Sequence, residues 1–95
     1  MLLPVAEYAR IITAVMVRLG YARKNNVETY VSDKEATLIL PTIINSGSDD
    51  AITILLRAKL EQAIGLEART VLTSADAGVL HDILINDPQE RQSHA

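Results

Sequence analysis

The sequence of 95 residues contains no cysteine, no phenylalanine and no tryptophan, and it has only three tyrosines. Without cysteine there is no disulfide framework, no thiolate nucleophile, and no zinc or iron–sulfur site with cysteine ligands. Without Phe and Trp the usual stacking platform for single-stranded nucleic acids and sugars is missing. These absences exclude several kinds of chemistry and predict a core made of aliphatic side chains.

The composition is otherwise that of a folded protein. Hydrophobic residues make up 48% of the chain and charged residues 22%, and the formal net charge is −3. This length and composition fit one globular domain. We therefore expect a single α+β domain over residues 1–86, followed by a flexible polar C-terminal tail over residues 87–95.

The start of the chain has no basic leader, and Glu7 and Arg10 interrupt its apolar run early. This pattern fits neither a signal peptide nor a membrane span. Together with the lack of cysteine, it predicts a cytoplasmic protein that does not associate with a membrane.

Helices, strands and turns alternate along the chain. Breakers, caps and hydrophobic periodicity predict helices over 4–19, 48–64 and 74–85, and strands over 27–31, 36–40 and 67–73. Gly20 and Gly65 are expected to end the first two helices, and Ser48 and Ser74 to cap the last two. The order is α-β-β-α-β-α, which predicts a small three-stranded, mainly antiparallel sheet with its helices packed on one face. No internal repeat is evident.

The acidic balance argues against nucleic acid as a partner, because neutralising phosphates supplies most of that affinity. Arg18, Arg23 and Lys24 cluster near Tyr21, but cations are also favoured at the end of a helix. The predicted order of elements is similar to that of KH-type RNA-binding domains, whose GXXG loop contacts the nucleic-acid backbone. This chain has no GXXG loop, so binding of nucleic acid is not expected.

One loop could hold a small ligand. Ser46, Gly47 and Ser48 precede a predicted helix, whose N-terminal N–H groups attract anions. The loop lacks the spacing and the lysine of a P-loop, and Asp49 and Asp50 place negative charge at the same helix end. A small-molecule or anion site at a subunit interface, with Tyr30 as a further polar contributor, is therefore the second functional hypothesis.

Little in the chain predicts catalysis. His81 and Asp82 are neighbours, but adjacent helical residues point about 100° apart. A minimal enzyme using His81 is the third hypothesis, and no catalytic residue is assigned because no nucleophile–base pair is identifiable. The acidic residues Asp33, Glu35, Asp49 and Asp50 lack the spacing of a calcium loop, and they are interpreted as cap and turn residues. We expect no metal and no cofactor.

The first helix carries more apolar surface than one small sheet can cover. Its flank includes Leu2, Val5, Ala9 and Met16, which we assign to an oligomer interface. A short chain buries such a surface most simply against a second copy, and a two-fold dimer is the default closed form. The preferred hypothesis is a homodimeric interaction module that binds a partner protein and performs no catalysis.

Overall fold

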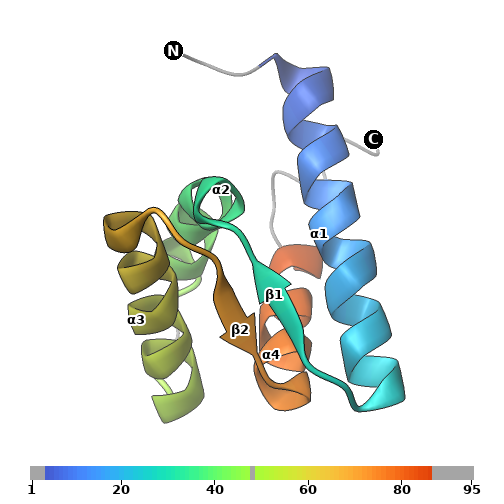
Figure 1. Ribbon diagram of the computed structural model, residues 1–95, viewed down its shortest axis with the longest axis vertical. Helices are drawn as coiled ribbons and strands as arrows, with labels where there is room; N and C mark the ends of the chain where they lie inside the picture. Colours follow the sequence, from blue (N-terminus) through green and yellow to red (C-terminus); the bar gives the residue numbers. More distant parts are fainter. Residues whose placement is uncertain (1–3, 48, 87–95) are drawn as a thin grey trace.

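The computed structural model describes residues 4–47 and 49–86, and this part of the chain holds four helices and two short strands. Both strands lie at the front of the molecule in the view of Figure 1, in front of the helices. In chain order the elements are α1 (Val5–Asn25), β1 (Thr29–Val31), α2 (Asp33–Asn45), α3 (Ala51–Leu66), β2 (Thr70–Leu72) and α4 (Ser74–Ile85). The expected α+β class is therefore confirmed at the coarse level.

The expected three-stranded sheet and its order are wrong. Residues 36–40 lie inside helix α2, and the sheet of the described residues has two strands only, β1 and β2, paired antiparallel with Tyr30 opposite Val71. The physical reason is a capping box: the Ser32 hydroxyl accepts from the Glu35 N–H, and the Glu35 carboxylate accepts from the Ser32 N–H. Pro41 lies inside this helix, where it removes one N–H donor.

Four helix ends also differ from the expectation. Helix α1 continues through Gly20 to Asn25 and ends at Asn26, which has a left-handed backbone with φ 54°. Helix α3 continues through Gly65 and ends at Glu67, with φ 51°. Its N-cap is Asp50, whose carboxylate accepts from the Thr53 N–H, where Ser48 was expected to cap. In α4 the cap is Thr73 instead of Ser74.

The two halves of the chain repeat one helix–strand–helix unit, which the sequence alone did not reveal. Several structural landmarks of the first half recur 41 positions later, so that the left-handed Asn26 corresponds to Glu67 and the cap Ser32 to Thr73. Every buried residue of the described chain has a buried counterpart at this offset. The pairs are Ile12/Thr53, Val15/Leu56, Leu19/Leu60, Ala22/Ala63, Val31/Leu72, Ala36/Ala77, Ile39/Leu80 and Ile43/Leu84.

The packing of the helices follows the same repeat. Helix α1 packs mainly on α4, and α3 packs mainly on α2. The first helix of each half therefore packs on the second helix of the other half. The central strand pair, Tyr30 and Val71, is itself a pair of equivalent positions. The halves are therefore related by an approximate two-fold axis that passes through the sheet.

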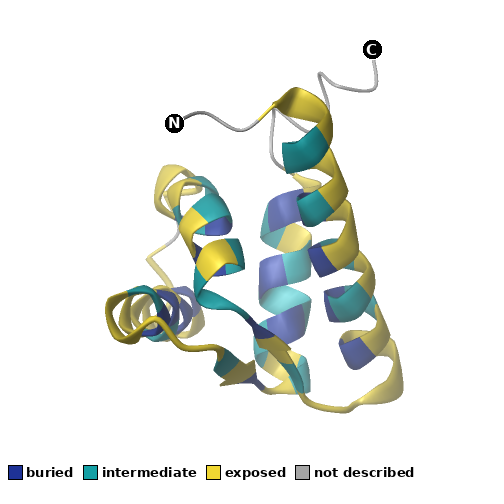
Figure 2. Cartoon of the chain, turned by 45° about the horizontal axis from the view of Figure 1, so that its top comes forward, coloured by how far each residue is buried: buried dark blue, intermediate teal, exposed yellow. Residues whose placement is uncertain are grey.

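The core lies between the four helices and the inner face of the sheet. Figure 2 shows the buried residues on the inner sides of the helices and exposed residues along the outer sides of α1 and α3. The core is aliphatic, with Thr53 its one polar member among the described residues. Within residues 4–47 and 49–86, no helix is both long and apolar enough to cross a membrane.

Candidate functional site

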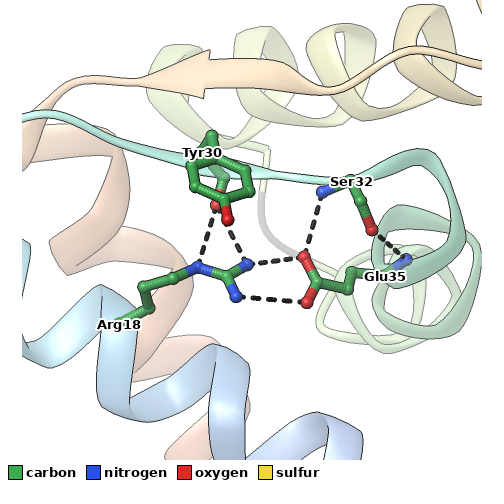
Figure 3. A network of polar contacts seen from close by, with 4 residues as sticks. All are labelled: Arg18, Tyr30, Ser32 and Glu35. Carbon is green, nitrogen blue, oxygen red and sulfur yellow. Dashed lines mark hydrogen bonds and ion pairs between the residues drawn. The ribbon is translucent and has the colours of Figure 1, made fainter.

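A cation from α1 is bound by a carboxylate from α2 beside the sheet. The Arg18 guanidinium donates to both carboxylate oxygens of Glu35, with N–O distances of 2.5 Å and 3.2 Å, and it donates twice to the backbone carbonyl of Tyr30. Figure 3 shows the guanidinium between the strand and the first turn of α2. Because Glu35 also closes the capping box of α2, this cluster fixes α1, β1 and α2 relative to one another. We call it the first clamp.

The second half has an equivalent clamp. The Lys59 ammonium of α3 donates to the Asp76 carboxylate of α4 at 2.6 Å, and that carboxylate also accepts from the Thr73 N–H. Lys59 and Asp76 lie at the positions equivalent to Arg18 and Glu35. Lysine provides a compact charge without the planar fork of arginine, and its ammonium bonds only to Asp76. We call this the second clamp.

Both clamp carboxylates have a lowered pKa. Burial alone raises the pKa of Glu35, but the hydrogen bond from Arg18, the one from the Ser32 N–H and the nearby guanidinium charge together hold the pKa below its ordinary value. Burial likewise raises the pKa of Asp76, but Lys59 and the Thr73 N–H lower this pKa by more, so that it lies below its ordinary value. These carboxylates stabilise the fold fully above the ordinary carboxyl pKa, and the stabilisation is lost as the pH falls through the lowered values.

The acidic residues expected to act as caps and turn residues can be compared with the ligands that a metal ion needs. Among the described residues, no group of three or more His, Asp or Glu side chains gathers around a common point. A calcium loop between two helices needs oxygen ligands at positions 1, 3, 5 and 12 and glycine at position 6. If Glu35 is placed at position 12, position 1 is Lys24 and position 6 is Thr29. The Glu35 carboxylate is instead occupied by a guanidinium.

The predicted basic cluster is divided between two helix contacts. Arg18 belongs to the first clamp, and Arg23 pairs with Asp82 of α4 at 2.6 Å. Arg18 and Arg69 also lie over the Tyr30 ring, with their guanidinium carbons 4.7 Å and 5.0 Å from its centre. In these contacts the guanidinium groups of Arg18 and Arg23 are each paired with a carboxylate of another helix.

The residues expected to form a ligand loop lie on different elements, and one of them is outside the described residues. Ser46 is the C-cap of α2, and its hydroxyl donates to the Ile43 carbonyl. Gly47 follows with φ 67°, and Ser48 lies outside the described residues. Tyr30 lies in β1, on the sheet. The Asp50 carboxylate already accepts an N–H at the start of α3, which is where an anion would bind.

His81 is half-buried at the contact between α1 and α4. Its ring lies against Gly20, where a methyl group would come to 3.3 Å from Nε2. Nδ1 is buried and has no hydrogen-bond partner among the described residues. Gly20, which lies within α1, therefore leaves space for the His81 imidazole of α4. This glycine serves the contact between the two helices and does not end α1.

The predicted oligomer interface on α1 does not form one continuous face. Val5 is 83% exposed and Ala9 is also exposed, whereas Met16 packs against the core. Leu2 lies outside the described residues. Residues 5–9 correspond to the connection 46–50 in the second half, so they form an additional stretch of helix, which extends beyond the other helices in Figure 1. We call residues 5–9 the projecting end of α1.

A second apolar surface, which the sequence analysis missed, lies on the outer side of α3. Leu55 is 63% exposed and Leu66 is 68% exposed, and Ile52 and Ile54 are about half exposed. At the positions equivalent to Ile54, Leu55 and Leu66, the first half has Thr13, Ala14 and Asn25. The repeated fold therefore forms without large apolar side chains at these positions. Along one line of this helix, residues spaced three or four apart carry no charge. That pattern was the sequence signal that could have revealed the surface.

Comparisons of the chain with protein-family models, with curated proteins and with solved structures found no match.

Proposed function

We propose that this protein is an interaction module that works as a homodimer and binds a partner protein without performing catalysis. The observation that carries this proposal is the apolar outer side of α3, where Ile54, Leu55 and Leu66 are exposed and the equivalent positions of α1 hold smaller or polar residues. Apolar surface that the fold does not need, and that water contacts, is typical of a protein–protein interface. The first half of the chain acts as an internal control for this argument.

The charged residues support the same proposal. Arg18, Glu35, Lys59 and Asp76 are used by the two clamps, and Arg23 and Asp82 join α1 to α4. Groups that hold helices together in this way are not available to move protons or attack a substrate. No observation favours a small-molecule site at the Ser46 loop or catalysis at His81.

The two apolar surfaces suit different tasks. The outer side of α3 runs the length of a helix, and we assign it to the homodimer. The projecting end of α1 is short and carries Val5, the most exposed large apolar side chain among the described residues. We assign this end to the partner protein.

We expect the wild-type protein to sediment at twice the chain mass of 10.4 kDa at micromolar concentration. The immobilised protein should retain a partner from the native cell extract in a fixed ratio. Val5→Asp should abolish that retention without unfolding the chain, because an acidic residue in the first turn of a helix is favoured by the helix dipole.

Thr13→Asp is the matched control, since it adds the same charge to an exposed position of α1 outside the projecting end. It should retain the partner as the wild type does. A monomer at all concentrations would contradict the homodimer. A set of retained proteins that is the same for wild type and Val5→Asp would contradict the role of the projecting end.

A further inference from the structure

The outer side of α3 has the spacing of a helix-pairing seam. Residues that alternate four and three positions apart lie along one line of a helix, and two helices in contact meet along such a line. All the residues of this seam are exposed and uncharged; they are Ala51, Leu55, Ala58, Gln62 and Gly65. Ile52 and Leu66 border the seam on one side, and Ile54 borders it on the other.

Small residues recur along the seam at every seventh position. Ala51, Ala58 and Gly65 are separated by two turns of helix each, and they allow another helix to approach closely. Leu55 and the bordering Ile52 and Leu66 then provide the apolar area that contact would bury. The equivalent line of α1 includes Arg10 and Lys24, so α1 has no uncharged seam of this length.

The charges beside the seam identify what fits it. Arg57 and Glu61 lie one turn apart at the border, with Nε and Oε1 3.5 Å apart. When two copies of α3 run antiparallel about an axis between Ala58 and Lys59, Arg57 of each copy lies within one turn of Glu61 of the other, on the same edge of the contact. In a parallel pair the two-fold axis runs along the helices, so the edges that carry Arg57 and Glu61 lie on opposite sides of the contact and do not meet. Lys59 is neutralised by Asp76 and adds no repulsion.

We propose that two copies of the chain pair through α3 in an antiparallel arrangement, with Ala58 near the two-fold axis and Arg57 facing Glu61 of the second copy. The proposal rests on the homodimer proposed above and adds to it the interface and its orientation. The surface is complementary to itself in shape and in charge, as the interface of a two-fold dimer must be.

Charge reversal tests the orientation. Arg57→Glu and Glu61→Arg should each raise the dimer dissociation constant at least about tenfold, because each variant places four like charges around the axis. The double variant Arg57→Glu with Glu61→Arg should restore the constant to within about threefold of the wild type. Sedimentation equilibrium at low salt measures all four proteins, and their circular dichroism shows whether they are folded. Equal constants for the single and the double variants would overturn the proposal.

A single introduced cysteine gives an independent test, since the chain has none of its own. Ala58→Cys should form a disulfide-linked dimer under mild oxidation, because the two sulfur atoms would meet near the axis. Val17→Cys is the control at the equivalent exposed position of α1, and it should remain monomeric on a denaturing gel. A wild-type dimer whose Ala58→Cys variant links no faster than Val17→Cys would overturn this arrangement and leave the proposed function intact. A monomeric wild type would contradict both.

Discussion

Replacing Leu60 with alanine is expected to lower the free energy of unfolding by about 2–5 kcal/mol, and replacing Leu19 is expected to have an effect of similar size. Both side chains are fully buried, and they occupy the same position in the two halves of the repeat. Each substitution removes apolar contacts and leaves a cavity that the neighbouring helices fill only in part. The loss is a large share of the stability of a domain of this size.

Urea denaturation at one fixed protein concentration measures this effect, and Val17→Ala is the control. Val17 is 67% exposed, and its truncation should change the free energy of unfolding by less than about 0.5 kcal/mol. If Leu19→Ala were strongly destabilising and Leu60→Ala nearly neutral, the two halves would not share one core, and the repeat would not describe the fold.

Replacing Arg18 with methionine is expected to destabilise the protein by about 1–3 kcal/mol, because it leaves a partly buried carboxylate without its cation. The Glu35 side chain is 17% exposed, and only the Ser32 N–H would remain to satisfy it. Arg18→Lys should cost less, since Lys59 fulfils the same task in the second clamp. Combined with Glu35→Gln, Arg18→Met should cost less than it does alone.

The same clamp predicts how stability depends on pH. Because folding lowers the pKa of Glu35 and of Asp76, the free energy of unfolding should be constant above pH 6 and fall below the ordinary carboxyl values of 4.5 and 3.8. Each carboxylate contributes a slope of at most about 1.4 kcal/mol per pH unit. Glu35→Gln keeps the capping box and should reduce this slope. A wild-type slope unchanged in Glu35→Gln and in Arg18→Met would contradict the first clamp.

The sequence predicted the helices that combine clear periodicity with clear caps. The last helix was placed within one residue of its observed start, because Thr73 and Ser74 are both good caps and an apolar face follows. Residues 36–40 were assigned to a strand because aliphatic residues and Pro41 also fit an extended chain. The capping box of Ser32 and Glu35 was the local signal that decides for a helix, and it was interpreted as a turn.

The repeat and the clamps could not be derived from local pattern. Only three of the equivalent core pairs are identical, Leu19/Leu60, Ala22/Ala63 and Ala36/Ala77, while the others exchange one small or aliphatic residue for another. A buried position requires an apolar side chain of about the right volume more than a particular residue, and every exchange except Ile12/Thr53 replaces one aliphatic side chain with another. Arg18 and Glu35 are 17 positions apart, as are Lys59 and Asp76, and only the fold brings each pair together.

The sequence analysis placed an apolar surface on α1 and missed the one on α3. Of the residues assigned on α1, Val5 and Ala9 are exposed, Met16 packs against the core, and Leu2 lies outside the described residues. Only some of the apolar residues of α3 lie on its buried side. The structure is needed to tell which of them remain exposed. Comparison with α1, the equivalent helix of the first half, then shows which apolar side chains of α3 the fold requires and which it does not.

The most direct test of this account is the molecular mass of Leu55→Lys beside that of Ala14→Lys, measured by sedimentation equilibrium at the concentration where the wild type is dimeric. The two substitutions place the same charge at equivalent, exposed positions of α3 and α1. We predict that Leu55→Lys is a folded monomer and that Ala14→Lys remains a dimer. A dimer that survives Leu55→Lys, or one that Ala14→Lys dissociates instead, would contradict the assignment of the outer side of α3 to self-association.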